Sequence, residues 1–262
     1  MPTIISVASG KGGVGKSSLA VNMSTRLQDG YGSTLLVDSD LLMANSHVLL
    51  NTRPTVDLID VLEGRCDWRD AVQKLPNGLS LLPGRTAANV LVESDAERLK
   101  DLLNTLKTTA HDFAYIIVDV PAGSGTGVMN TVSVADHTMV VLLGQATSFV
   151  DAYALIKNAY FEKNVTSFSA VVNMAKSAEQ AKMIFDNFER TVSSFLPVKL
   201  VYAGYMPKMS EINASSVHGR SIDRDVMKAR IYPKIDSILA ALFAGGAGYT
   251  GPDAVTFHSP VP

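Results

Sequence analysis

The sequence predicts an α/β fold with a mostly parallel central sheet and helices on both faces. Short runs rich in β-branched residues alternate with longer helical patterns along the chain, as in strands joined by helical crossovers. Several runs are apolar throughout, as are strands covered on both faces. With 262 residues and 47% hydrophobic content, the chain can bury the core of one such domain.

The order of the predicted elements follows from this alternation. We expect strands at residues 4–8, 34–38, 79–83, 115–119, 137–143, 169–173 and 200–205. Helices are expected at residues 16–27, 55–63, 95–108, 148–161 and 177–195, with a last helix ending near Phe243. No repeat, linker or charge block interrupts the series, so residues 1–244 are predicted to form a single domain. Residues 245–262, rich in glycine and proline, are expected to be an irregular tail.

Composition excludes several classes of protein. A net charge of −2 provides no overall attraction to nucleic acid or anionic lipid. Cys66 is the single cysteine, so the chain cannot form an internal disulfide or supply the thiolates of an iron–sulfur reductase. No signal sequence or apolar stretch of about 20 residues is present, and we expect a cytoplasmic protein.

A phosphate-binding loop follows the first predicted strand and opens the first predicted helix. Glycines in such a loop let successive backbone N–H groups point at phosphate oxygens, and the helix adds its positive N-terminal end. Lys16 is expected to reach the β- and γ-phosphates of ATP or ADP, and the Ser17 hydroxyl to bind Mg²⁺. The predicted nucleotide-binding residues of the loop are Gly10, Lys11, Gly12, Gly13, Val14, Gly15, Lys16, Ser17 and Ser18.

Three aspartates complete the predicted site. Asp38 and Asp40 follow the second strand and Asp119 ends the fourth, so all three lie at the edge where ligands of open α/β sheets bind. Asp119 is predicted to be a carboxylate of the magnesium shell. A carboxylate at position 40 suffices to position an attacking water. The alternative for Asp40 is that it only caps a helix.

These motifs resemble the MinD/ParA family of P-loop ATPases, whose phosphate loop also reads K-G-G-x-G-K-[ST]. The resemblance implies a fold of the MinD/ParA (SIMIBI) type and an ATPase that dimerises in the ATP state. In that family the early lysine crosses the interface to the partner's nucleotide, which assigns a catalytic role in trans to Lys11. The alternative for Lys11 is a solvated loop lysine.

The same resemblance assigns roles to further residues. It implies that Asp38 organises the magnesium shell, that Asp40 positions the water and that residues 120–127 form a switch loop. Asn173 and Pro207 match the family's adenine-contacting positions, although asparagine at a strand end is also an ordinary turn residue.

Within the family, the chain is most similar to the flagellar-number regulators of the FlhG or FleN type. Residues 43–45, 58–64 and 147–157 carry this similarity. It implies control of flagellar number or placement, a protein partner such as a flagellar switch component or transcription activator, and recruitment to a cell pole. Without kinship, residues 147–157 would still form a strand-to-helix turn with Ser148 as cap.

Some residues depart from the family pattern or leave other functions open. Leu42 and His47 replace a glycine and an aspartate, which bears on the hydrolysis rate and admits an ATP-binding scaffold. The flagellar N-terminal motif is not expected, because the first strand begins at Ile4. The alternatives are positioning of a secretion system, pilus or cellulose synthase, a metabolic enzyme such as a carboxylating ligase, and DNA partitioning. DNA binding would use Lys199, Lys208, Arg220, Arg224, Lys228 and Arg230, diluted by Asp223 and Asp225.

The last predicted helix bears on membrane attachment. An apolar stripe of Ile235, Ile238, Leu239 and Leu242 lies along one side, and no basic residue follows Lys234. An interfacial helix would carry basic residues beside its apolar face. We therefore expect the stripe to dock on the protein's own core, and membrane binding has no support in the sequence.

Overall fold

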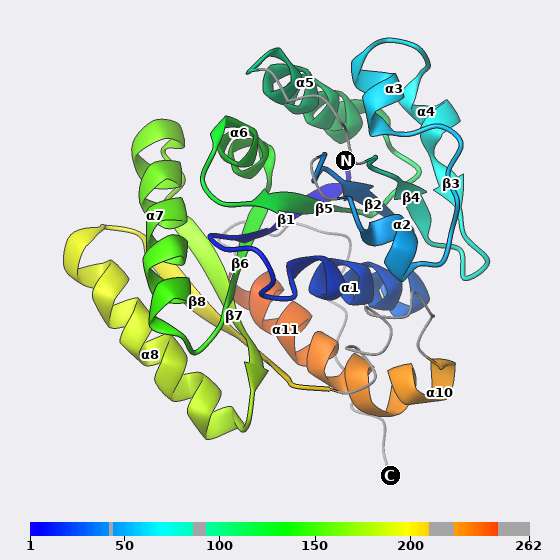
Figure 1. The fold of residues 1–262 in the computed structure, drawn as a ribbon. Helices are drawn as coiled ribbons and strands as arrows, with labels where there is room; N and C mark the ends of the chain where they lie inside the picture. The colour runs from blue at the N-terminus through cyan, green and yellow to red at the C-terminus, as the bar shows by residue number, and fades with distance from the viewer. Residues whose placement is uncertain (42–43, 86–92, 210–222, 246–262) are drawn as a thin grey trace.

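The computed structural model describes residues 1–41, 44–85, 93–209 and 223–245, and the strands among them form one eight-stranded sheet (Figure 1). The strand order is β3-β4-β2-β5-β1-β6-β7-β8. All neighbouring strands pair in parallel except β3 and β4, which are antiparallel. The strands are β1 (Thr3–Ser9), β2 (Thr34–Asp38), β3 (Gln73–Lys74), β4 (Ser80–Leu82), β5 (Tyr115–Ala122), β6 (His137–Leu142), β7 (Ser167–Ala175) and β8 (Lys199–Pro207).

Helices cover both faces of the sheet, each over its own buried apolar cluster (Figure 1). On one face lie α3 (Leu58–Leu62), α4 (Trp68–Ala71), α5 (Glu93–Thr109), α6 (Thr126–Val134), α7 (Ala146–Lys163) and α8 (Ala178–Phe195). The other face is covered by α1 (Lys16–Gly30) and α11 (Tyr232–Gly245), with the π-helix η1 (Met227–Ile231) contributing to the same cluster. The short helices α2 (Ser46–Leu49) and α10 (Arg224–Val226) flank α1.

The fold class and the predicted strands are confirmed. β2 has the predicted bounds, and six further strands differ from prediction by a few residues at their ends. The antiparallel edge strand β3 was not predicted, because two residues are too few to show a period. β5 also continues past Asp119 to Ala122, so the predicted switch loop 120–127 is wrong in its bounds: its first residues are strand and α6 begins at Thr126.

The predicted helices all occur, but several ends were misplaced. The helix predicted at 55–63 is only Leu58–Leu62, because Asp57 caps it by accepting hydrogen bonds from the amides of Ile59 and Asp60. Helix α6 was missed because its glycine, threonines and valines have low helix propensity. Burial of Val128, Met129 and Val132 offsets that preference.

The C-terminal helix docks on the core, as predicted. Ile235, Ile238, Leu239 and Leu242 are all buried and pack in the cluster beneath α1. In the described part of the chain, no helix is both long and apolar enough to cross a membrane. Of the predicted tail 245–262, only Gly245, which ends α11, lies within the described residues.

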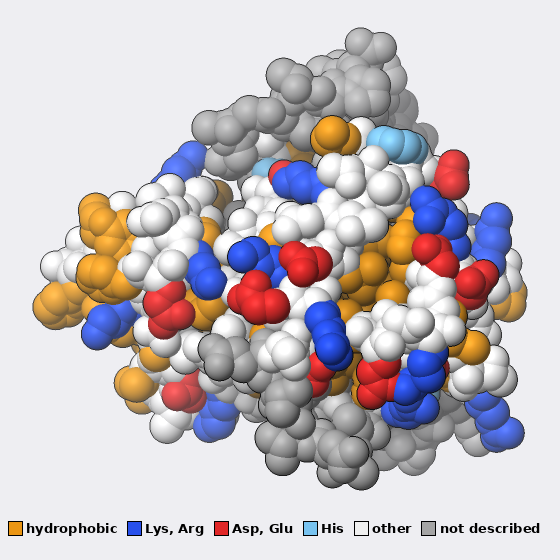
Figure 2. Space-filling view, turned by 90° about the horizontal axis from the view of Figure 1, so that it is seen from above, with side chains coloured by type: hydrophobic (Ala, Val, Ile, Leu, Met, Phe, Trp, Pro, Cys, Tyr) orange, Lys and Arg blue, Asp and Glu red, His pale blue; other side chains and the backbone are white. Residues whose placement is uncertain are grey.

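The basic residues considered for DNA binding do not form one described patch. Lys199 begins β8 and Lys208 follows its end, so they are separated by a nine-residue strand of about 30 Å. Arg224, Lys228 and Arg230 lie on α10 and η1, whereas Arg220 lies outside the described residues. On the face seen in Figure 2, basic and acidic side chains are interspersed and apolar side chains show between them.

Docking of α11 predicts a large effect of truncating its buried face. Leu239→Ala removes a fully buried side chain and is expected to lower the free energy of unfolding by about 2–5 kcal/mol in urea titration. The control is Ser237→Ala on the exposed side of the same helix, expected to change stability by less than about 0.5 kcal/mol. Equal effects of the two substitutions would show that α11 is not packed in solution.

Candidate nucleotide-binding site

The phosphate loop connects β1 to α1 at the carboxyl edge of the sheet, with tight packing around its glycines. Gly13 and Gly15 have φ angles of 78° and 86°, in the left-handed region that favours glycine. A Cβ at Gly10 would lie 2.1 Å from the backbone of Asp151 on α7, so a side chain there would displace the helix. The loop thus has the conformation and setting that its glycine pattern predicts.

Lys16 and Asp119 form a buried ion pair at the base of this loop. Lys16 Nζ lies 2.6 Å from Asp119 Oδ1 and 3.4 Å from Ser17 Oγ, and both charged side chains are almost fully buried. A buried charge needs a partner of opposite charge, and Asp119 provides it for Lys16, the lysine that the motif predicts will bind phosphate. Three predicted site residues are therefore in contact.

Asp38 lies beside Asp119 because β2 and β5 are paired in parallel and in register at these two residues. Its carboxylate accepts hydrogen bonds from the backbone N–H groups of Asn45 and Ser46 at 3.1 and 2.9 Å. Burial, reinforced by the negative charge of Asp119, raises the pKa of Asp38 to about 7, while Ser46 and Lys16 act against the increase. Lys16 thus lies near two buried acids, Asp38 and Asp119, and a bound cation would balance the second negative charge.

Asp40 follows Asp38 by two residues and is half-buried at the same edge. Its backbone N–H donates to Asp38 Oδ1 at 3.3 Å. Asp40 does not cap α2, because that helix begins at Ser46 and its N-cap residue is Asn45. Its assignment to the attacking water stays a prediction.

Lys11 occupies the same loop as Lys16 but lies on its exposed side. Its Nζ donates a hydrogen bond to Thr147 Oγ1 at 3.2 Å, near the start of α7. The two lysines of the loop therefore face different surroundings, one buried against the acids and one accessible from outside. Its role in trans stays a prediction.

The two predicted adenine-contacting residues lie on adjacent strands. Asn173 on β7 donates from Nδ2 to the carbonyl of Val14 at 2.7 Å, so it holds the phosphate loop directly. Pro207 ends β8, whose register pairs it with Ala175. Both stand at the carboxyl edge of the sheet, and their contact with adenine stays a prediction.

The residues gathered here fit a magnesium ion held mainly by a nucleotide. Mg²⁺ in nucleotide sites takes one or two protein ligands and completes its shell with phosphate oxygens and water. Ser17, Asp38 and Asp119 supply one hydroxyl and two carboxylates, and the described residues contain no group of three or more His, Cys, Asp or Glu that could hold a metal alone. The donor set thus suits Mg²⁺ with a phosphate ligand.

One cavity of the described structure lies apart from the acidic residues of the site. It measures about 680 Å³, lies along the outer side of α1, and includes Ser18 as its single residue from the phosphate loop. Its walls come from α2, the turn after β3, and the α10 and η1 segment. Lys16, Asp38 and Asp119 do not line this cavity.

Sequence reasoning missed residues that act through their neighbours. Ser46 donates its backbone N–H to Asp38 and its hydroxyl to Asp119 at 3.5 Å, but a serine eight residues after an aspartate forms no recognisable motif. Thr147 was noticed only as part of a similar segment, without its contact to Lys11. Of the two departures from the family pattern, His47 has a buried Nδ1 that finds no hydrogen-bond partner among the described residues, and Leu42 lies outside them.

The raised pKa of Asp38 predicts that this residue lowers the free energy of unfolding of the nucleotide-free protein in a pH-dependent way. An acid with a pKa of about 7 when folded and about 4 when unfolded binds more protons in the folded state between those values. The contribution of Asp38 to the stability of the fold therefore falls as pH rises from 4 to 7. We expect Asp38→Asn to raise the melting temperature by about 5 °C at pH 8 and by much less at pH 5 in calorimetry. Asp70→Asn, on the exposed side of α4, is the control, and a pH-independent gain would contradict the assignment.

Comparison with known proteins agrees with this geometry. A family model described as an AAA domain matches residues 2–167. The antiactivator FleN of Pseudomonas aeruginosa is 34% identical over 204 residues, covering 78% of this chain and 73% of FleN. The flagellum site-determining protein YlxH of Helicobacter pylori is 25% identical over 241 residues, covering 91% and 81%. The MinD structure with Mg-ADP from Pyrococcus horikoshii superposes with a TM-score of 0.73 at 21% identity, covering 94% and 98%. The chain belongs to the MinD/ParA family of P-loop ATPases, in the branch that includes FleN.

Proposed function

We propose that the protein is an ATP-dependent dimerisation switch that hydrolyses ATP slowly and controls the number or placement of flagella. The observation that carries the proposal is the different setting of the two lysines in one phosphate loop. Lys16 is buried against Asp119, whereas Lys11 is exposed and donates a hydrogen bond to the surface residue Thr147. An exposed lysine at this edge is placed to reach a nucleotide held by a second copy of the chain.

The remaining site residues would divide the work of phosphoryl transfer. The glycines of the loop and Lys16 would bind the phosphates, which releases Asp119 from its ion pair. Ser17, Asp38 and Asp119 would hold Mg²⁺, which when bound neutralises charge on the phosphate oxygens. Asp40 would orient the attacking water, and Asn173 and Pro207 would contact the adenine. Support for these roles comes from the clustering of the residues at one edge of the sheet.

The proposed cargo rests on the relatives. FleN is an antiactivator, which supports a protein partner, and YlxH is a flagellum site-determining protein, which supports a connection with flagella. We propose a flagellar switch component or a flagellar transcription activator as that partner. A cytoplasmic switch recruited to a cell pole would fit such a role.

Lys11→Ala tests the dimerisation step. The substitution is expected to leave nucleotide affinity within a few-fold of native, because Lys16 remains, but to keep the protein monomeric with Mg·ATP in light scattering. Lys74→Ala, on exposed edge strand β3, is the matched control and should dimerise normally. Lys16→Ala should lose ATP binding and serves as the control for a protein that does not bind nucleotide. A Lys11→Ala protein that still dimerises would remove the trans assignment.

Asp40→Ala tests hydrolysis and the cargo together. Loss of the water-positioning carboxylate is expected to slow turnover by about 100-fold and to accumulate the ATP-bound dimer, measured by phosphate release and light scattering. The trapped protein, immobilised with Mg·ATP or Mg·ADP, should capture a flagellar switch protein or transcription activator from host lysate only with ATP. Capture of secretion, pilus or polysaccharide-synthase components, or of bulk DNA, would keep the switch and replace the flagellar cargo. Undiminished turnover would remove Asp40 from the mechanism.

A further inference from the structure

Helix α3 belongs to the segment 58–64 that resembles the flagellar branch, yet none of its residues enters the site described above. Its N-terminus carries a complete capping box. Asp57 accepts hydrogen bonds from the backbone N–H groups of Ile59 and Asp60, and the Asp60 carboxylate accepts one from the backbone N–H of Asp57. Two carboxylates therefore lie together at the start of a short helix, and Arg65, just after its end, pairs with Asp60 at 2.5 Å.

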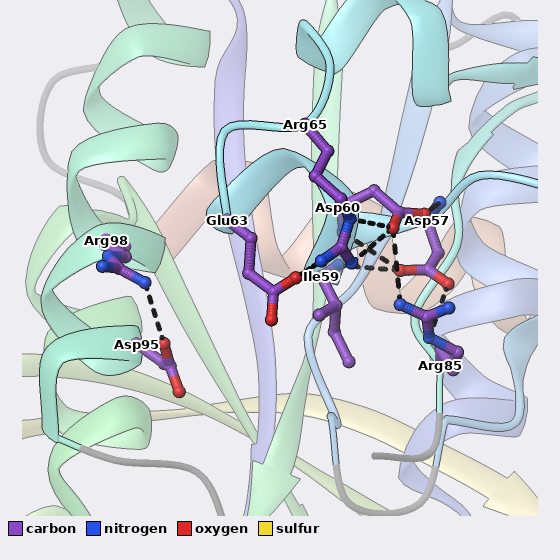
Figure 3. Close-up of polar contacts among 8 residues, drawn as sticks. All are labelled: Asp57, Ile59, Asp60, Glu63, Arg65, Arg85, Asp95 and Arg98. Atoms are coloured by element: carbon purple, nitrogen blue, oxygen red, sulfur yellow. Dashed lines mark hydrogen bonds and ion pairs between the residues drawn. The ribbon is translucent and has the colours of Figure 1, made fainter. Parts of the chain in front are cut away.

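Arg85 binds both carboxylates of this capping box, as Figure 3 shows. Its Nε lies 3.0 Å from Asp57 Oδ2, and one terminal nitrogen lies 3.4 Å from Asp60 Oδ1. The Asp57 side chain is only 8% exposed, so this contact is better shielded from water than an ordinary surface pair. Arg85 thus joins the start of α3 to the chain that follows β4.

A second contact joins the same two segments. The backbone N–H of Leu58 donates to the carbonyl of Pro83 at 2.8 Å. Residue 84 is therefore held on both sides, by the Pro83 carbonyl before it and by the Arg85 guanidinium after it. The position of Gly84 depends on these two attachments to α3.

Gly84 packs directly against Asp38 of the magnesium site. A Cβ at position 84 would lie 2.7 Å from the Asp38 carbonyl oxygen, 3.0 Å from Ala44 Cβ and 3.4 Å from Asp38 Cγ. The Asp38 carboxylate also accepts hydrogen bonds from the N–H groups of Asn45 and Ser46. Asp38 is consequently enclosed between Gly84 and the turn that leads into α2.

We propose that Arg85 is a positioning residue for the magnesium site, which acts by fixing Gly84 against Asp38 through the capping box of α3. The inference rests on the proposed assignment of Asp38 to the magnesium shell. Arg85 touches neither nucleotide nor metal in this scheme. Its effect reaches the site through the backbone of residues 83–84, so the guanidinium sets how closely the Asp38 carboxylate is confined.

The test compares two arginines that are similarly exposed and each paired with acid. Arg85 is 50% exposed and Arg98 on α5 is 53% exposed, and the Arg98 pair with Asp95 is drawn beside the Arg85 cluster in Figure 3. Within the described part of the chain, Arg98 pairs with Asp95 on its own helix, so Arg98→Ala controls for the loss of a surface ion pair. Binding of a fluorescent ADP analogue is titrated at increasing Mg²⁺, and without Mg²⁺ in the presence of a chelator.

Arg85→Ala is expected to need about 10-fold more Mg²⁺ for half-maximal binding, as when the partner of a metal ligand is removed, while binding without Mg²⁺ changes little. Arg98→Ala should match the native protein. In the nucleotide-free protein, hydrogen exchange of the 44–49 segment should also be faster in Arg85→Ala, because the N–H groups that bind Asp38 lie there. Should Arg85→Ala fold poorly, Arg85→Lys keeps the charge but cannot span both acids, and the same shift is expected at smaller size.

The outcomes separate the inference from the proposed function. If the native protein binds nucleotide in a Mg²⁺-dependent way but Arg85→Ala and Arg98→Ala need the same Mg²⁺ concentration, the positioning role alone is overturned. If the native protein binds nucleotide equally well with and without Mg²⁺, the magnesium site is overturned, and the inference with it. Gly84→Ala gives an independent check, since its Cβ would press on Asp38 and should shift the Mg²⁺ requirement without touching Arg85.

Discussion

The buried ion pair between Lys16 and Asp119 organises the carboxyl edge of the sheet. Lys16 pairs with Asp119, and Asp38, the second buried acid, has its pKa raised to about 7 by burial and by the charge of Asp119. The cluster is therefore short of positive charge until a cation arrives, and Lys16 is not free for phosphate until Asp119 releases it. Because two charges compete for one lysine, nucleotide and Mg²⁺ are expected to bind together more favourably than either alone.

The parallel sheet places these groups together without long loops. β1 lies next to β5, and β5 lies next to β2, so the phosphate loop, Asp119 and Asp38 follow three adjacent strands. Paired residues on neighbouring strands are about 5 Å apart, so the backbone pairing alone brings Asp38 and Asp119 close together. The chain then crosses to β6 on the other side of β1, and this change of direction leaves the edge open to a ligand.

Most of the fold and the residues of the phosphate loop could be predicted because their signals are local. Buried parallel strands appear as short apolar runs, and the loop appears as a fixed glycine and lysine pattern. What could not be predicted depends on tertiary contacts. Helix α6 forms against its residues' preferences because its apolar side chains are buried. Ser46 and Gly84 contact Asp38 from positions 8 and 46 residues away, and no spacing rule connects them to it.

The contacts around Asp38 also indicate how the surface could influence the site. Asp38 is enclosed by two segments, the turn at 44–46 and the backbone at 83–84, and neither is part of a strand. The second segment is fixed to α3 by a guanidinium that is half exposed to solvent. A ligand or partner that competes for that guanidinium would loosen Gly84, and the effect would reach the buried carboxylate through the backbone of residues 83–84. Such a short connection requires no rearrangement of the sheet, so it would tune the affinity for Mg²⁺ without altering the fold.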